Sequence, residues 1–315
     1  MRLAVSAPFR LDLTVWALRR ATSNRIDTWD GRQWRRSVFL GDAVVGIAVE
    51  QCGPIDAPVL TLRCVDGDRC GPNPVQAIAA VVRRVLGLDA NDLDRLIPPD
   101  PQITALARRY RGLRPPRFVE LFEALANAIA CQQVSLASGL ALLSKTAASL
   151  APARLPADFP PPFPRPETIL AAGGDALRRL GWSRRKSDYL LGCAQAVVGG
   201  ALDPDRLEAA GDAEVMQLLS RLRGIKRWSA QYVALRGLGR LAVLPVDDVG
   251  AHKHLALWLG RPRLDAAAME LLAERWAPAA GLVYFLLLLK RLDDAGLIDS
   301  RLLPQHGTHS GQIAC

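Results

Sequence analysis

Two adjacent acids in the C-terminal half of the chain could act on the sugar of a nucleotide. Asp247 and Asp248 follow Leu244-Pro245-Val246 and are expected at the start of a helix. An aspartate at that position commonly caps the helix, because its carboxylate accepts hydrogen bonds from the first free amides. Adjacent side chains point in different directions. We therefore expect one of the two to cap the helix and the other to be free for chemistry.

A basic glycine turn precedes these acids by one predicted helix. Leu222-Arg223-Gly224-Ile225 is followed directly by Lys226 and Arg227. Glycine permits a sharp reversal of the chain, and backbone N–H groups at a helix N-terminus bind anions such as phosphate. The turn could therefore hold a phosphate near the acid. An ordinary helical hairpin with a glycine turn would have the same sequence.

Two aromatic residues follow the turn at helical spacing. Trp228 and Tyr232 stand at positions i and i+4, which places them on one face of a helix. They could line a pocket as stacking walls. Core packing is the commoner role of such a pair.

Charge favours a polyanionic partner. The 315 residues have a formal net charge of +9 and a pI of about 9.7. This charge suits binding to nucleic acid, although a merely soluble basic protein would have the same charge.

The six cysteines form no CxxC pair or Cys/His cluster, so we expect no metal and no other cofactor. Cys64 and Cys70 bracket a turn and could pair. No signal peptide is visible, and the apolar run 282–289 is too short to span a membrane. A cytoplasmic protein is expected.

The elements that would position these residues form a strand-rich first part and a helical remainder. Alternating or β-branched segments predict strands at 9–15, 38–49 and 59–65, and a helix is predicted over 74–86. The first unit, residues 1–98, is therefore expected to be a small antiparallel sheet with one helix. Residues 99–303 are expected to be helical, interrupted by a proline-rich irregular segment at 152–166. Residues 304–315 are expected to be a disordered tail.

Several segments together resemble one family. Leu-x-Gly-Ile-x-x-Trp-Ser-Ala-x-Tyr, followed by Pro-x-Asp-Asp, is similar to the helix-hairpin-helix/Gly-Pro-Asp superfamily of DNA glycosylases, and within it to the bacterial DNA-3-methyladenine glycosylase II family. Residues 128–135 (AIACQQVS) resemble that family's Ile-x-x-Gln-x-Val-Ser segment. Residues 180–186 (LGWSRRK) and 273–278 (AERWAP) resemble its Leu-Gly-x-x-x-x-Lys and Trp-x-Pro segments. The resemblance covers most of residues 5–295.

The resemblance implies a fold and an activity. The implied fold is α+β: the small antiparallel sheet domain precedes a two-lobed all-α domain, with the helix-hairpin-helix at about 212–237 and the substrate cleft between the lobes. The implied activity is base excision repair by a monofunctional glycosylase, which hydrolyses the N-glycosidic bond of alkylated purines of the 3-methyladenine type. Its partner would be double-stranded DNA that contains such bases. The protein would be associated with the nucleoid and would act as a monomer.

The resemblance also implies residue roles in catalysis. Asp248 matches the catalytic aspartate, which stabilises the developing oxocarbenium ion and helps water attack. Asp247 is then the expected helix cap. An alkylated purine is positively charged and leaves readily, so one carboxylate can suffice. Trp228 and Tyr232 match pocket aromatics that stack on the flipped, electron-poor base. Strand-cutting relatives carry a lysine nucleophile in place of Trp228, which argues against lyase activity.

DNA-binding roles follow from the same resemblance. Gly224, Ile225 and Lys226, with the adjacent Arg227, match the hairpin that grips a phosphate, and Gln133 matches the wedge that fills the gap left by the extruded nucleotide. Lys226 departs from the family, which has a second glycine there. If that position needs a positive φ, the lysine costs about 1 kcal/mol.

Two other functions stay open at this point. One is a bifunctional glycosylase/lyase for oxidised bases. The other is a non-catalytic helix-hairpin-helix DNA-binding protein, in which Asp248 serves only as a helix cap.

Overall fold

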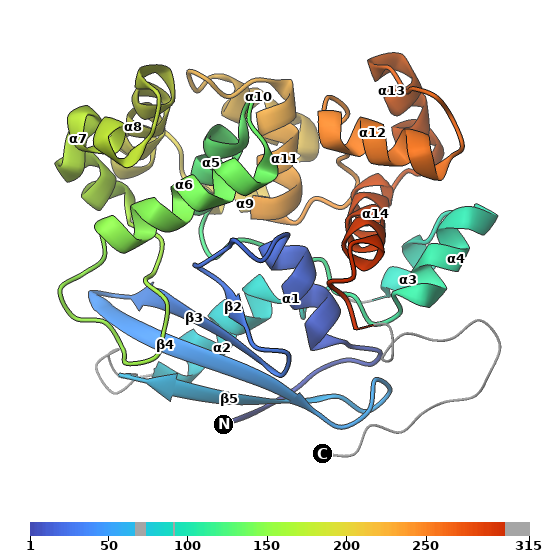
Figure 1. Cartoon of the computed structure of the whole chain (residues 1–315), viewed down its shortest axis with the longest axis horizontal. Coiled ribbons are helices and arrows are strands. Elements are labelled where there is room, and N and C mark those ends of the chain that lie inside the picture. Colours follow the sequence, from blue (N-terminus) through green and yellow to red (C-terminus); the bar gives the residue numbers. More distant parts are fainter. Residues whose placement is uncertain (67–73, 91, 300–315) are drawn as a thin grey trace.

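The chain begins with a small antiparallel sheet. In the computed structural model, which describes residues 1–66, 74–90 and 92–299, five strands form the order β1-β5-β4-β3-β2, with every neighbouring pair antiparallel. The strands are β1 (Arg2–Ala4), β2 (Thr28–Trp29), β3 (Gln33–Leu40), β4 (Ala43–Cys52) and β5 (Val59–Val65), and α2 (Pro74–Val85) follows them. The predicted sheet and its helix are confirmed (Figure 1).

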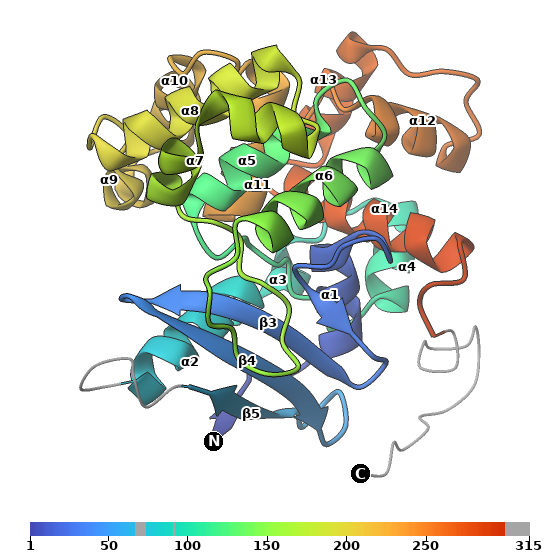
Figure 2. The same ribbon diagram turned by 60° about the vertical axis from the view of Figure 1, so that its left-hand side comes forward.

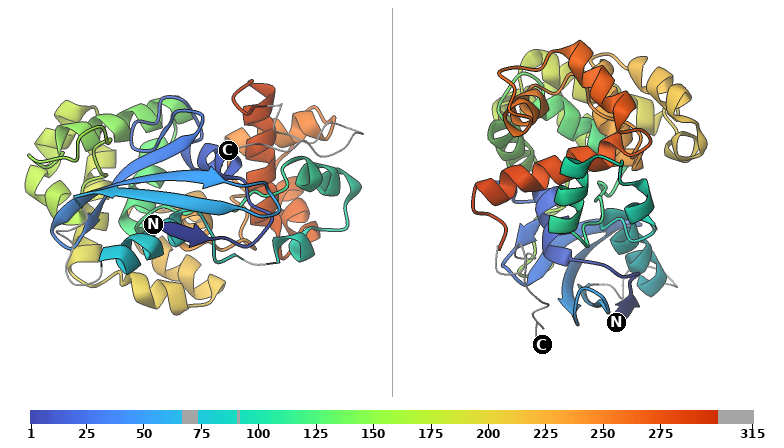
Figure 3. Two further views of the ribbon diagram at one scale, coloured as in Figure 1. Left: turned by 90° about the horizontal axis from the view of Figure 1, so that it is seen from below. Right: turned by 90° about the vertical axis from the view of Figure 1, so that its right-hand side faces the viewer.

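Helices make up most of the remaining described chain. They are α3 (Leu93–Leu96), α4 (Pro101–Arg109), α5 (Leu121–Cys131), α6 (Leu136–Ser149), α7 (Pro166–Leu180), α8 (Arg184–Val198), α9 (Pro204–Ala209), α10 (Asp212–Ser220), α11 (Arg227–Leu238), α12 (Val249–Trp258), α13 (Ala266–Arg275) and α14 (Ala280–Asp294). The side view in Figure 3 shows the helical part stacked on the sheet. The α+β class is confirmed.

One predicted strand is a helix. Residues 9–15 were expected to be extended because apolar and polar side chains alternate there, but α1 spans Leu11–Arg19. Its apolar residues serve two cores at once: Leu11, Val15 and Leu18 pack in the sheet's core, whereas Leu13 and Trp16 pack in a core with α14. A helix buried on both sides has apolar residues all round, so a short window of alternation cannot distinguish it from a strand.

The helical part has two cores, one in each lobe. The first lobe is built from α5 to α11, and its core includes Leu125, Leu190 and Ile225. The second is built from α4, α12, α13 and α14 together with one face of α1, and its core includes Trp276 and Phe285. Figure 2 shows the lobes side by side above the sheet. The predicted two-lobed arrangement is therefore present.

The proline-rich segment crosses the sheet. Residues 151–165 contain no helix or strand, as expected, and they descend onto the sheet face in Figure 2. Phe159 packs on Gly46 of β4 so closely that a side-chain carbon at Gly46 would lie 2.7 Å from the ring. The segment therefore packs against the sheet through Phe159.

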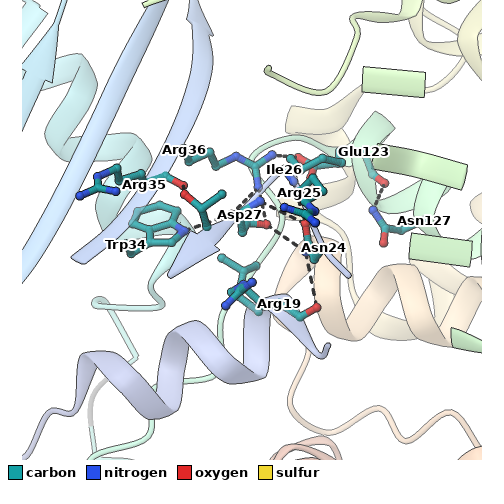
Figure 4. Close-up of polar contacts among 12 residues, drawn as sticks. Arg19, Asn24, Arg25, Ile26, Asp27, Trp34, Arg35, Arg36, Glu123 and Asn127 are labelled. Carbon is teal, nitrogen blue, oxygen red and sulfur yellow. Dashed lines mark hydrogen bonds and ion pairs between the residues drawn. The ribbon is translucent and has the colours of Figure 1, made fainter. Parts of the chain in front are cut away.

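A buried ion cluster joins the sheet to the first lobe. Arg36 of β3 donates from Nη1 to Asp27 at 2.9 Å and from Nη2 to Glu123 of α5 at 2.6 Å, and all three side chains are almost fully buried (Figure 4). Trp34 donates from its indole nitrogen to Asp27 at 3.1 Å. The predicted boundary at residue 98 stays a prediction, because α1 and this cluster tie the two parts together.

Two earlier expectations fall on residues that the structure does not describe. Cys70, the possible partner of Cys64, lies outside the described residues, and so does the tail 304–315. Within the described ranges, no single helix is long and apolar enough to cross a membrane, although α13 and α14, which are bent by 112°, meet that threshold as a pair.

Candidate active site

A cleft of about 740 Å³ opens between the two lobes. One wall comes from the first lobe: the junction of α5 and α6, the start of α8, and the turn before α11. The other wall is the segment that leads into α12, with Asp247 and Asp248. The volume suits a single small ligand such as a nucleobase with its sugar. The elements that the sequence singled out therefore meet at one place.

The carboxylate of Asp248 is shared between a helix and the cleft. Its Oδ1 accepts from the backbone N–H of Ala251 at 2.9 Å, so Asp248 is the N-cap of α12. Its Oδ2 accepts from the Trp228 indole nitrogen at 3.3 Å and from the Tyr284 hydroxyl at 3.1 Å. One oxygen thus fixes the side chain, and the other is held by two neutral donors, of which Trp228 lines the cleft.

The expectation that Asp247 is the cap is wrong. Asp247 instead accepts two hydrogen bonds from Arg227, at 2.5 and 2.7 Å, and Arg227 also donates to Glu270 of α13 at 2.6 Å. These hydrogen bonds lower the pKa of the Asp247 carboxyl below its usual range. Arg227 was predicted to bind DNA, but its guanidinium is occupied by two carboxylates, which join α11 to the second lobe.

The predicted pocket aromatics occupy different depths. Trp228 lines the cleft, and its ring centre lies 5.4 Å from that of Tyr232 at an interplanar angle of 30°. Tyr232 is only 3% exposed and does not line the cleft. Its hydroxyl accepts from Nη1 of the buried Arg20 at 2.5 Å. Tyr232 therefore supports Trp228 from behind and is not itself a wall, because its own side of α11 faces the core.

The glycine turn is shaped by packing against α8. Gly224 has a φ of +90°, and a side-chain carbon there would lie 2.2 Å from the ring of Tyr189. Ile225 was expected to contact DNA, but its side chain is fully buried in the core of the first lobe and anchors the turn. Lys226 is exposed with a φ of −101°. The position therefore needs no glycine, and the suspected strain at Lys226 is absent.

The α5–α6 junction is tied to the same turn. The side-chain nitrogen of Gln132 donates to the Gly224 carbonyl at 2.8 Å and to the Ser229 hydroxyl at 2.9 Å. Gln133, the predicted wedge, is exposed at the edge of the cleft and has a φ of +55°. A positive φ is uncommon for a residue with a side chain. Gln133 lies in the junction between α5 and α6 and belongs to neither helix.

Electrostatics keep the donors to Asp248 neutral. Burial and the negative charge of Asp248 raise the pKa of the Tyr284 hydroxyl well above its usual range, so it remains a hydrogen-bond donor at neutral pH. Two buried arginines lie beneath Tyr232. Arg20 also donates to Asn127 at 2.6 Å, and burial lowers the pKa of Arg236 to about 10.

Several site residues escaped the sequence reasoning. Tyr284 lies in an apolar helical run with no polar motif around it, and Gln132 stands beside the residue that was chosen. Tyr189 and Lys186 of α8 line the cleft, and Lys186 donates from Nζ to the Ala130 carbonyl at 2.8 Å. Only the segment 180–186 gave a signal for α8, through its resemblance to a family motif. Tyr284 gave none.

Two helical lobes, a hairpin at their junction and a carboxylate facing it across a cleft define the architecture of a helix-hairpin-helix DNA repair protein. Residues 126–278 match the model of the HhH-GPD superfamily base excision DNA repair protein. The resemblance drawn from the sequence is thereby confirmed.

Among curated proteins, the chain is similar to DNA-3-methyladenine glycosylase 2 of Escherichia coli strain K12. The two are 36% identical over 170 residues, which is 53% of this chain and 56% of that protein. The chain therefore matches little more than half the length of this relative.

Among solved structures, the chain resembles a 3-methyladenine DNA-glycosylase from Archaeoglobus fulgidus, with a TM-score of 0.79 and 24% identity over 95% of this chain and 100% of that one. It also resembles the apo form of an 8-oxoguanine glycosylase/lyase from Clostridium acetobutylicum, with a TM-score of 0.71 and 13% identity over 90% and 93% of the two chains. At these identities the likeness establishes the fold. Because both activities occur on it, the choice between them depends on the site.

Proposed function

We propose that this protein is a monofunctional DNA glycosylase that releases alkylated purines of the 3-methyladenine type from duplex DNA. The observation that carries the proposal is the position of Asp248, which lines the cleft and whose Oδ2 is held by hydrogen bonds from Trp228 and Tyr284. A fixed carboxylate at this place can stabilise positive charge on a sugar that enters the cleft. The wider setting would be base excision repair on the nucleoid, with the protein acting as a monomer.

The proposed reaction is a hydrolysis at C1′ of the damaged nucleotide. The bond between C1′ and the purine nitrogen breaks, and its electron pair leaves with the base, which neutralises the alkylated ring. Asp248 stabilises the oxocarbenium ion that develops on the sugar. Water then bonds to C1′ and loses a proton to the solvent or to the carboxylate, which leaves an abasic site.

Residue 228, where strand-cutting relatives carry a lysine, is a tryptophan in this chain. Trp228 occupies the position that the resemblance assigns to the lysine nucleophile of lyases. Its indole lies in the cleft, where it can stack on a cationic base. Binding such a base by its π-face and its charge would favour alkylated over ordinary purines.

Base release from methylated duplex DNA tests the proposal. We expect free 3-methyladenine from the wild-type protein, an intact DNA strand until the abasic site is cleaved chemically, and no covalent adduct after borohydride treatment. An adduct trapped by borohydride would favour the glycosylase/lyase reading. Binding to abasic DNA without release of any base would favour a non-catalytic binding protein.

A further inference from the structure

A tight turn at residues 245–248 delivers Asp248 to the cleft. The turn is closed by a hydrogen bond from the backbone N–H of Asp248 to the Pro245 carbonyl at 3.1 Å. Residues 245–248 belong to no helix or strand. The peptide groups of Val246, in the middle of the turn, therefore need partners from other segments. The position of the Asp248 carboxylate depends on what holds Val246.

Side chains from two helices hold the peptide groups of Val246. Its N–H donates to Oε1 of Gln231 in α11 at 3.1 Å, and its carbonyl accepts from Nε2 of His252 in α12 at 2.5 Å. The orientation of the Gln231 amide follows from this contact, because a backbone N–H can only donate and the side-chain oxygen must face it. His252 ties the turn to the helix that follows it, whereas Gln231 ties it to the opposite wall.

The contact between Gln231 and Val246 joins the two lobes. The Val246 side chain is only 5% exposed and packs in the core of the second lobe. Gln231 is half-buried on α11 of the first lobe and does not line the cleft. This hydrogen bond therefore fixes the backbone two residues before Asp248 from outside the cleft.

Helix α11 makes two other contacts with the turn, and both are less suited to fixing its backbone. Arg227 pairs with Asp247, but these side chains are 48% and 34% exposed, and an ion pair so exposed contributes little. The indole of Trp228 donates to Asp248 at 3.3 Å, but the proposed mechanism also requires this ring to stack on the base. Among the described contacts of α11 with the turn, that of Gln231 is made to a backbone atom.

We propose that Gln231 is a positioning residue for base release. By holding the Val246 N–H, it sets the place of the turn and thereby the distance between the Asp248 carboxylate and a sugar in the cleft. It acts through the backbone and touches no substrate. A small displacement of a reacting group costs much of the rate, so this hydrogen bond contributes to the chemical step. The inference rests on the proposed function, because base release is the reaction concerned.

The test compares Gln231→Met with Gln231→Glu in base release from methylated duplex DNA. Methionine keeps the length of the side chain and removes the acceptor, so the single-turnover rate at saturating DNA should fall about tenfold. Glutamate keeps an acceptor oxygen for the Val246 N–H and should stay within about threefold of the wild-type rate. The affinity of both variants for undamaged duplex DNA should be unchanged.

The matched control is Gln195→Met, which makes the same chemical change at an exposed position of α8. It should release base at the wild-type rate. The proposal would be overturned by equal rates for Gln195→Met and Gln231→Met, by a Gln231→Glu variant as slow as Gln231→Met, or by a loss confined to DNA affinity.

Hydrogen exchange of the Val246 amide, followed by NMR in the absence of DNA, tests the contact independently of the reaction. Gln231→Met should speed this exchange about tenfold and leave the amides of α5 at their wild-type rates, which excludes general loosening of the fold. Unchanged exchange at Val246 would also overturn the proposal. If the wild-type protein releases no base, the proposed function fails while the exchange still reports the contact. If the wild type and Gln231→Met release base equally well, only the positioning role fails.

Discussion

At the scale of the residue, Asp248 combines two roles that sequence reasoning had assigned to different acids. The Oδ1 atom caps α12, and the Oδ2 atom faces Trp228 and Tyr284. The sequence placed the acid pair correctly at a helix start. It assigned the cap to the wrong acid, because the partners that distinguish the two acids, Arg227 for Asp247 and Tyr284 for Asp248, come from other helices.

Tyr284→Phe tests whether the hydroxyl positions the carboxylate. The ring volume is kept, and only the donor to Oδ2 is lost. A hydrogen bond of this kind contributes about 1–1.5 kcal/mol, so the single-turnover rate of base release should fall about tenfold, with little change in DNA affinity. The control is Tyr110→Phe, which removes a hydroxyl that donates to Asp293 in the second lobe, away from the cleft. Equal rates for the two variants would show that Tyr284 has no role in positioning.

At the scale of the element, the turn before α11 depends on its contact with α8. The sequence predicted a glycine reversal there, and Gly224 does have a positive φ. The residues that hold the turn, Tyr189 and Gln132, were not predicted, because their contacts join segments distant in sequence. Contacts between segments distant in sequence also explain why α1 was predicted as a strand, because its helical form follows from burial between two cores.

Gly224→Ala should destabilise the turn. The added carbon meets the Tyr189 ring and forces an alanine into the left-handed region, so we expect a loss of about 2 kcal/mol or more in the free energy of unfolding. DNA affinity should fall with it. The measurement is urea denaturation combined with anisotropy.

Gly192→Ala provides the control for this substitution. Gly192 lies inside α8 with no atom within 4 Å of the added carbon, and alanine in a helix interior is favoured over glycine by up to about 1 kcal/mol. The free energy of unfolding of Gly192→Ala should therefore be unchanged or higher than that of the wild type. A similar loss for both variants would contradict the role of the Tyr189 contact.

At the scale of the whole molecule, the sheet and the helices are joined by the buried cluster around Arg36. The sequence predicted both parts and placed the boundary between them at residue 98. It gave no sign that Arg36, Asp27 and Glu123 would meet, since each is an ordinary charged residue in its own segment. Pairing in the interior compensates charges that would otherwise be costly to bury.

Arg36→Met should leave two buried carboxylates without their cation. We expect a loss of about 3–5 kcal/mol in the free energy of unfolding, measured by urea denaturation. Arg35→Met, at the preceding position of β3, removes a partly exposed partner of Asp30 and should cost less than about 1 kcal/mol. A small effect at Arg36 would mean that the cluster does not hold the two parts together.

The most direct test of the central claim compares Asp248→Asn with Asp247→Asn in base release from methylated duplex DNA. Asparagine is also a good N-cap, so Asp248→Asn can keep the bond to Ala251 while it removes the charge. We predict that the single-turnover rate falls by at least about a hundredfold for Asp248→Asn, with DNA binding retained, and that it changes little for Asp247→Asn. Release at the wild-type rate by Asp248→Asn would contradict the account.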